Sequence, residues 1–297
     1  MSVSRQAREN VAGYLFIMPN LLGVGLFTLF PILFSLVLVF ADWDYLKGFS
    51  GISWAGLDNF AELGQDEKFG KALFNTIYFT VVAVPLSMVL GAAAAIVLNS
   101  HVYLKSLIRV LFFLPYVSSV VAVGIVWSVL YNPREGPVNQ FLRSLGITDP
   151  PGWLASARWA MPAIIIMMVW TYIGYAMIIY MAGLQGISKD LYEAADIDGA
   201  GKLKQLFRIT VPMLKPMSFL IAITLIIASF QIFGAIAVMT QGGPLNSTMV
   251  LAYHIYLQAF RFNHMGYAAT VSWVLFVLIF VVTLVQWRSQ RRWQERF

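Results

Sequence analysis

Residues 159–188 read WAMPAIIIMMVWTYIGYAMIIYMAGLQGIS, a run of 30 positions without a single Asp, Glu, Lys or Arg. A charged side chain at the centre of a lipid bilayer costs about 2.5–3.5 kcal/mol even on lenient insertion scales. About 20 helical residues cross the hydrocarbon core, given a rise of ~1.5 Å per residue and a thickness of ~30 Å. The run is therefore predicted to be a transmembrane helix.

Five further charge-free runs lie along the 297-residue chain, and they cover residues 10–41, 72–104, 110–133, 216–260 and 262–287. The run 216–260 is long enough for two spans, but its second half contains the polar, turn-rich stretch QGGPLNST from Gln241 to Thr248. We expect one span there, followed by an external segment. The sequence thus predicts an all-α integral membrane protein with six transmembrane helices.

The composition supports a membrane protein. Hydrophobic residues make up 59% of the chain and charged residues 11%, whereas an average soluble chain is about a quarter charged. A large water-soluble domain on the same chain is excluded by this balance. The chain has no cysteine, so a disulfide framework is excluded as well.

The distribution of Lys and Arg predicts the orientation of the spans. With the N-terminus inside, thirteen of the twenty basic residues fall on the cytoplasmic side, namely Arg5, Arg8, Lys105, Arg109, Lys189, Lys202, Lys204, Arg208, Lys215, Arg288, Arg291, Arg292 and Arg296. Cytoplasmic loops carry an excess of basic residues, so both termini are expected inside. The net charge of +6 then reflects loop anchoring rather than binding of nucleic acid.

The expected organisation has three parts. Residues 1–11 form a cytoplasmic segment, 12–287 the six-helix transmembrane domain, and 288–297 a basic cytoplasmic tail. The first apolar run is much longer than the 7–15-residue core of a signal peptide, so we expect it to remain as the first helix. The first external loop, residues 42–71, is rich in acidic residues.

The cytoplasmic loop after residue 188 is patterned like a helical hairpin. Ser188 is a plausible N-cap, Leu191, Ala194 and Ala195 share one helical face, and acidic residues in the first turns favour a helix. Gly199 and Gly201 are expected to end that helix. A second amphipathic stretch follows, with its larger side chains at Leu203, Leu206, Phe207 and Thr210, before Pro212 starts the next span.

The first helix of this loop could lie on lipid or dock on a protein. Four carboxylates within nine residues would be repelled by the anionic inner leaflet, which favours a protein partner. Ala194, Ala195 and Gly199 allow close approach in a groove, with Leu191 and Tyr192 as larger anchors.

This loop resembles the EAA loop of bacterial ABC importer permeases. The matching residues are Glu193-Ala-Ala, Asp198-Gly199-Ala, Gln205, Phe207, Ile209, Pro212 and Pro216, with Val211 at a position where Leu is usual. Other segments resemble the maltose-type, carbohydrate-uptake branch, and they are Phe113-Leu-Pro-Tyr116, Gly124-x-x-Trp127, Asn132, Asn139, Thr240-x-Gly-Gly-Pro244 and Thr248. The resemblance extends over nearly the whole chain, with the loop spanning residues 185–216.

The resemblance implies a core subunit of an importer in the bacterial cytoplasmic (inner) membrane, as a multi-pass protein. Its partners would be a second permease subunit, two ATPase subunits that bind ATP and Mg, and an extracytoplasmic solute-binding protein. The residues expected to couple to the ATPases are Leu191, Tyr192, Glu193, Ala194, Ala195, Asp198 and Gly199.

No enzymatic activity is expected of this chain. It lacks the G-x-x-x-x-G-K-[ST] phosphate loop, so the energy for uphill transport must come from separate subunits. The three histidines, His101, His254 and His264, lack metal-ligand spacing, and no cofactor is expected on the chain itself.

The solute is expected to bind where polar and aromatic side chains meet inside the bundle. Sugars present hydroxyl groups for hydrogen bonds and apolar ring faces for stacking. The candidates for the pathway are Tyr116, Thr171, Tyr172, Tyr175, Ser229, Gln231 and Phe233. Tyr116, Tyr175 and Ser229 fall at positions similar to sugar-contacting ones in the maltose-type family, although Asn is common around Ser229 there.

Two alternatives remain open at this level. The same architecture could import a non-sugar solute such as glycerol 3-phosphate, although an anion would favour cationic groups in the pathway. An ion-coupled secondary carrier would need carboxylates within the membrane or inverted repeats. The sequence also leaves open whether the substrate site lies on this chain or on its partner permease.

Overall fold

The computed structural model describes residues 5–99 and 103–294, with their side chains apart from those of residues 5–8, 11, 289 and 291–294. The chain is mainly helical and divides into two compact units, one formed by Met1–Gln65 and Ile255–Val274, the other by Asp66–His254 and Leu275–Phe297. Some residues named in the sequence predictions have side chains outside the described part of the structure, and they are His101, Arg5, Arg8, Arg291, Arg292 and Arg296.

The first unit begins with one long apolar helix. Its parts are α1 (Arg5–Val24), a π-helical turn (Gly25–Leu29) and α2 (Phe30–Leu38). A small antiparallel hairpin follows, with β1 (Ala41–Trp43) paired to β2 (Ile52–Trp54), and then α3 (Asp58–Gln65). Between the strands lie two 3₁₀ turns, Tyr45–Lys47 and Phe49–Gly51. The hairpin and α3 form most of the region predicted only as an acidic external loop.

Aromatic stacking and one buried amide fix this hairpin. Trp43 stacks on Phe49 with ring centroids 5.7 Å apart, and Trp54 stacks on Phe40 at 5.9 Å. The Asn59 side chain in α3 donates to the carbonyl oxygens of Val39 and Ala41 at 2.9 and 3.0 Å. Because Asn59 is buried, its two bonds pair its side-chain amide with backbone carbonyls away from water.

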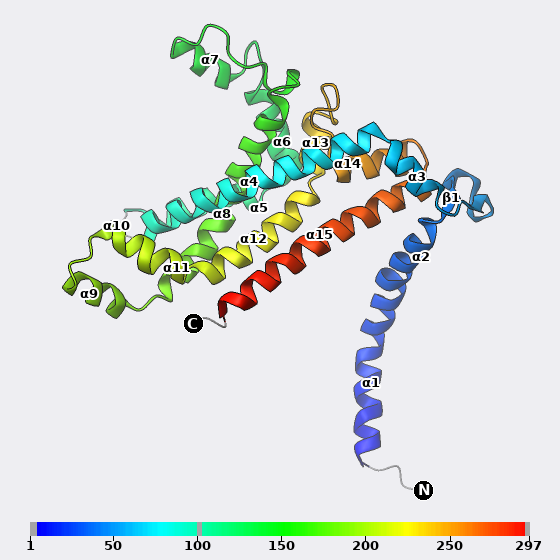
Figure 1. Cartoon of the computed structure of the whole chain (residues 1–297), viewed down its shortest axis with the longest axis horizontal. Coiled ribbons are helices and arrows are strands. Elements are labelled where there is room, and N and C mark those ends of the chain that lie inside the picture. The colour runs from blue at the N-terminus through cyan, green and yellow to red at the C-terminus, as the bar shows by residue number, and fades with distance from the viewer. Residues whose placement is uncertain (1–4, 100–102, 295–297) are drawn as a thin grey trace. The chain divides into compact units, whose positions relative to one another are not determined.

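The second unit contains most of the remaining helices (Figure 1). They are α4 (Glu67–Asn99), α5 (Lys105–Val117), α6 (Val120–Leu130), α7 (Pro137–Ser144), α8 (Ala160–Gln185), α9 (Lys189–Ile197), α10 (Lys202–Gln205), a π-helical turn (Leu206–Thr210), α11 (Val211–Met213), α12 (Lys215–Phe230) and α13 (Gly234–Met239). A 3₁₀ turn, Trp153–Ala155, precedes α8. Three elements remain. The π-helical turn Leu257–Arg261 belongs to the first unit, whereas α14 (Leu251–Tyr256) and α15 (Met265–Gln294) each have residues in both units.

Helix α8 lies at the centre of the second unit and packs against α4, α5 and α12. Small residues permit the close approach. A methyl group on Gly91 of α4 would lie 2.5 Å from the Ala176 methyl of α8, and one on Gly174 would collide with the backbone carbonyl of Phe112 in α5. Such contacts are typical of helices packed within a membrane, where van der Waals packing drives association.

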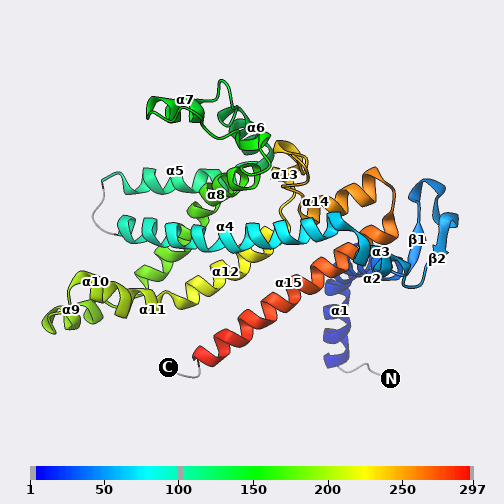
Figure 2. The ribbon, with the colours of Figure 1, turned by 45° about the horizontal axis from the view of Figure 1, so that its top comes forward.

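Figures 1 and 2 show α9, α10 and α11 at the same end of this unit as the C-terminal end of α4, with α13 at the other end of α12. The loop 189–214 and the turn-rich segment after α13 are therefore separated by the length of α12.

Four helical stretches in the described part of the chain are long and apolar enough to cross a membrane, and they are Ala12–Leu38, Glu67–Asn99, Ala160–Gln185 and Met265–Arg288. Two bent pairs bring the number to six if each pair is one span, Lys105–Val117 with Val120–Leu130 and Lys202–Met213 with Lys215–Phe230. The structure is thus compatible with between four and six spans.

The third predicted span is not a straight helix. Its two halves, α5 and α6, differ in direction by 100°. The break lies at Ser118 and Ser119, whose ψ angles of 151° and 123° are extended rather than helical. Pro115 precedes the break, and proline weakens a helix by removing a backbone donor.

The fifth predicted span also differs from a single continuous helix. It begins at Lys215, just after a 60° bend, rather than at Pro212, and α12 ends at Phe230. Residues 231–233 are not helical, and α13 resumes only at Gly234.

Candidate functional site

Two tyrosines predicted for the solute pathway stack directly on each other. The rings of Tyr116 in α5 and Tyr175 in α8 have centroids 4.8 Å apart and an interplanar angle of 23°. Phe113 lies next to Tyr116, with ring centroids 5.8 Å apart. Both tyrosines are half-buried. The pair combines apolar ring faces with hydroxyl groups in the part of the bundle where α5 packs on α8.

A third tyrosine links this pair to α12. Tyr172 is one helical turn from Tyr175 on α8 and lies close to Ser229 near the end of α12. Ser229 is fully buried and Tyr172 nearly so. Tyr116, Tyr172, Tyr175 and Ser229 thus form one cluster from three helices, which we call the tyrosine cluster.

The other predicted pathway residues lie apart from this contact network. Thr171 donates its hydroxyl to the carbonyl oxygen of Met167 in its own helix at 3.1 Å. Gln231 is exposed and lies in the non-helical segment after α12. Phe233, in the same segment, contacts Tyr253 with ring centroids 6.0 Å apart. Tyr253 was not predicted, although it stood in the sequence beside the turn-rich stretch.

The segment after α13 is tied to the first turns of α4. Asn75 donates to the carbonyl oxygens of Asn246 and Met249 at 3.1 and 2.8 Å, and Thr76 accepts from the backbone N–H of Leu251 at 3.0 Å. Sequence reasoning missed this role of Asn75 and Thr76. Their signal was a pair of adjacent polar residues in an otherwise apolar run.

The predicted Gly-Gly-Pro turn has internal hydrogen bonds of its own. The Thr248 hydroxyl donates to the carbonyl oxygen of Gly243 at 2.8 Å and lies 2.7 Å from the Thr240 hydroxyl. These contacts explain why the two threonines accompany the turn. With the bonds from α4, they anchor residues 240–251, here called the GGP segment, to the rest of the second unit.

A buried histidine follows the GGP segment. The Nε2 atom of His254 lies 3.1 Å from a carboxylate oxygen of Asp66, the residue just before α4. Burial lowers the pKa of His254, and this effect exceeds the opposing attraction of Asp66. Within the described residues, no group of three or more His, Asp or Glu side chains could hold a metal ion.

The loop between α8 and α12 forms the predicted helical hairpin. The Ser188 side chain accepts from the backbone N–H of Asp190 at 3.2 Å and so caps α9, as predicted. The helix ends at Ile197. Two residues later Gly199 has a φ of +70°, and the backbone N–H of Ala200 donates to the carbonyl oxygen of Ala195 at 2.8 Å. This left-handed backbone conformation favours glycine, and the predicted end of the helix at Gly199 is confirmed.

Helix α9 has an outer face and an inner face. The exposed residues include Leu191, Glu193, Ala194, Asp198 and Gly199 of the predicted coupling set. Tyr192 and Ala195 are half-buried instead, and the Tyr192 hydroxyl lies 2.8 Å from the Thr210 hydroxyl. Tyr192 therefore contacts its own chain, whereas the outer face offers small and acidic residues around Leu191. The exposed side chains on this face leave it accessible to a partner.

Polar side chains also form hydrogen bonds across the turn between α9 and α10. Asp196 of α9 accepts from the Nζ atom of Lys202 at 3.1 Å and from the side-chain amide of Gln205. These hydrogen bonds lower the pKa of the Asp196 carboxyl group below its ordinary value. Gln205 belongs to the sequence pattern that resembles the EAA loop, but its contact with Asp196 was not predicted, because the pattern does not indicate which residue it bonds.

Residues 87–295 match a family described as binding-protein-dependent transport system inner membrane component. The lactose transport system permease protein LacF of Rhizobium radiobacter is 38% identical, over 95% of this chain and 95% of its own length. The arabinooligosaccharides transport system permease protein AraP of Bacillus subtilis is 32% identical, over 93% of this chain and 88% of its own.

The fold is similar to that of two solved chains. One comes from the crystal structure of a bacterial ABC transporter involved in the import of the acidic polysaccharide alginate, with a TM-score of 0.82 over 97% of this chain and 98% of that chain, at 22% identity. The other comes from a bacterial alginate ABC transporter in complex with a periplasmic protein bound to an alginate pentasaccharide, with a TM-score of 0.83 over 97% and 96%, at 21% identity.

Proposed function

The chain belongs to the family of binding-protein-dependent transport system inner membrane components, and we propose that, as the permease subunit of a carbohydrate ABC importer, it lines the path of the sugar. It is a multi-pass membrane protein, with several apolar helices long enough to cross a bilayer. Relatives that carry the names of lactose and arabinooligosaccharide transport support a carbohydrate as the solute.

The stacked pair of Tyr116 and Tyr175 is the observation that carries the assignment of a pathway. Aromatic rings favour the apolar faces of sugar rings, and phenolic hydroxyl groups donate and accept hydrogen bonds with sugar hydroxyls. Tyr172 and Ser229 add two further hydroxyl groups from the same cluster. The tyrosine cluster thus offers the chemistry that an uncharged oligosaccharide requires.

The interruption of the fifth span supports a path beside α12. Non-helical backbone at membrane depth is tolerated where it is buried in protein or lines a water-filled cavity. The segment 231–233 would place the exposed Gln231 side chain along the path. Thr171 and Phe233 complete the proposed pathway residues.

Energy would come from separate subunits. The chain has no phosphate loop, so we assign ATP and Mg to two partner ATPase subunits rather than to this chain. The exposed face of α9, with Leu191, Glu193 and Ala194, is the proposed contact with an ATPase. A second permease subunit would complete the pathway, and a solute-binding protein would dock at the end that carries the GGP segment.

The proposed topology follows the distribution of basic residues. Six spans between residues 12 and 287 place both the N-terminal segment 1–11 and the basic tail 288–297 in the cytoplasm of a bacterium, with the protein in its cytoplasmic membrane. In this arrangement α9 and α10 lie inside and the GGP segment lies outside.

The test is purification of the chain with its partners, followed by transport in vesicles. An affinity-tagged permease should retain ATPase subunits, and ATP-driven uptake of a radiolabelled oligosaccharide should require the solute-binding protein. Tyr175→Ala should raise the KM for uptake about tenfold, because loss of stacking removes on the order of 1.4 kcal/mol. Tyr78→Ala, which removes a partly exposed tyrosine of α4, is the matched control and should leave the KM unchanged.

Three results would each contradict a part of the proposal. Purification without an ATPase would contradict the energy source. Uptake of an anion such as glycerol 3-phosphate, with no sugar transported, would contradict the carbohydrate assignment. Equal KM values for the wild type and Tyr175→Ala would exclude the tyrosine cluster as the path on this chain.

A further inference from the structure

Backbone hydrogen bonds close the end of α9 as far as Ala200 and begin again at Gly201, which precedes α10, so these bonds do not join the two helices to each other. The turn between the helices contains Gly199 and Gly201, and no atom packs within 4 Å of where a side chain on either glycine would begin. Glycine has more conformational freedom than any other residue. The hairpin has two arms, α9 on one side of the turn and α10 with the π-helical turn Leu206–Thr210 on the other. The direction of one arm relative to the other must therefore be fixed largely by contacts between their side chains.

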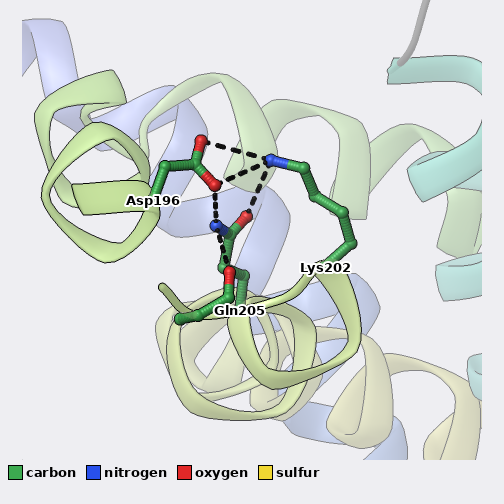
Figure 3. Close-up of polar contacts among 4 residues, drawn as sticks. Asp196, Lys202 and Gln205 are labelled. Carbon is green, nitrogen blue, oxygen red and sulfur yellow. Dashed lines mark hydrogen bonds and ion pairs between the residues drawn. The ribbon is translucent and has the colours of Figure 1, made fainter. Parts of the chain in front are cut away.

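Two sets of polar contacts join the arms. At the closed end, Lys202 and Gln205 both bond to Asp196 (Figure 3). At the open end, the hydroxyl groups of Tyr192 and Thr210 lie 2.8 Å apart. A hairpin tied near both ends can rotate as one body, whereas a hairpin tied at one end can still open.

Gln205 is the central member of the closed end. It is 4% exposed, although it lies in a polar loop. Its amide nitrogen donates to Asp196 and, at 3.0 Å, to the carbonyl oxygen of Ala200, while its amide oxygen accepts from Lys202 at 3.3 Å. One side chain thus contacts α9, the turn and α10.

The three members are not equally important. The Lys202 side chain is 81% exposed and that of Asp196 is 53% exposed, and exposed ion pairs contribute little because water and salt screen them. The buried amide of Gln205 has no water to replace its bonds, so its removal leaves Asp196 and Ala200 without their inner partner.

We propose that Asp196, Gln205 and Lys202 form a brace that, together with the Tyr192–Thr210 contact, holds α9 rigidly against α10 so that displacement of α9 moves the start of α12. This inference rests on the proposed function, in which an ATPase pushes on α9. The brace members act as positioning residues, since they face their own chain while Leu191 and Glu193 face outward.

The connection from the brace to the membrane is short. Gln205 ends α10, and the π-helical turn, α11 and a bend of 60° lead directly to α12 at Lys215. α12 carries Ser229 of the tyrosine cluster near its other end. A stiff hairpin would therefore pass movement to the helix that borders the proposed path.

The experiment compares coupling in reconstituted complexes of the full chain. In Gln205→Ala the number of sugar molecules imported per ATP hydrolysed should fall about fivefold, with ATPase subunits still bound. Gln205→Glu should be at least as uncoupled, because it places a second carboxylate against Asp196. Asp196→Asn added to Gln205→Glu exchanges donor and acceptor and should recover part of the ratio. Lys202→Gln should change it less, and Lys204→Gln, at an exposed neighbouring lysine, not at all.

A second measurement reports the hairpin directly. The chain has no cysteine, so Lys189→Cys with Arg208→Cys gives two specific sites for spin labels, one on each arm. Pulsed EPR on the permease in nanodiscs should give a narrow distance distribution, which Gln205→Ala broadens. The brace would be overturned if Gln205→Ala left both the distance distribution and the transport ratio unchanged. It would also be overturned if Gln205→Ala failed to assemble with the ATPase subunits while its distance distribution stayed unchanged. Failure of the wild type to bind an ATPase would instead contradict the proposed function, since the hairpin distance is measured on the permease alone.

Discussion

The His254 side chain places a titratable group in a buried position beside Asp66 in the second unit. It is 1% exposed, and the charged groups that face it are Asp66 and Lys68. Burial lowers its pKa below the ordinary value of about 6.5, so the unfolded chain binds a proton more readily than the folded chain does. The contribution of His254 to stability is complete above about pH 6.5 and is lost as the pH falls towards the folded pKa.

We therefore expect the melting temperature in detergent to decrease between about pH 7.5 and pH 5.5, and to decrease less in His254→Gln. Glutamine is neutral throughout and can still donate to Asp66. His264→Gln removes an exposed histidine and should retain the wild-type pH dependence. The same decrease in His254→Gln as in the wild type would show that other groups cause it.

At the level of elements, the contact between α5 and α8 depends on Gly174. A methyl group there would collide with the Phe112 carbonyl, and the two helices would have to separate. Overpacking of this kind typically costs about 1–3 kcal/mol. We expect Gly174→Ala to lower the melting temperature and to weaken sugar uptake, because Tyr116 and Tyr175 lie on these two helices.

The control for this prediction is Gly70→Ala. Gly70 lies in α4 with no atom within 4 Å of the added methyl group, so alanine should be neutral or stabilise the helix by up to about 1 kcal/mol. Equal stability of Gly174→Ala and the wild type would contradict the close packing of α5 on α8.

For the molecule as a whole, the proposed topology predicts opposite accessibility at the two ends of α12. Leu245 in the GGP segment is 84% exposed and Ile197 in α9 is 88% exposed. In intact cells, a membrane-impermeant maleimide should label Leu245→Cys but not Ile197→Cys, and permeabilisation should expose both. Labelling of Ile197→Cys in intact cells would reverse the orientation.

Hydropathy predicted the long helices because the cost of a charge in lipid acts on every residue of a span. It did not predict the interruptions at Ser118 and at residues 231–233, because an average over a window is insensitive to the φ and ψ angles of two or three residues. The hairpin of β1 and β2 was missed for a different reason. Acidic residues dominate that loop in composition, but its structure depends on pairs of aromatic rings.

The candidate site was predictable in part. Polarity within apolar runs, with the family resemblance, selected Tyr116, Tyr172, Tyr175 and Ser229, and the structure brings these four together. Thr171 and Phe233 were selected by the same reasoning, yet their contacts lie elsewhere. Side-chain direction decides which residues meet, and it depends on helix rotation that composition does not specify.

The non-helical segment between α12 and α13 also has a consequence for how such a protein can diversify. Within a helix, each substitution is constrained by helix propensity, which differs by up to about 0.7 kcal/mol among ordinary residues. Gln231 is exposed and outside any helix, so its replacement is free of that constraint, whereas the neighbouring Ile232 is buried. If Gln231 lines the path as proposed, gene duplicates could acquire new solute preferences by changes at this one position while the surrounding helices keep their packing.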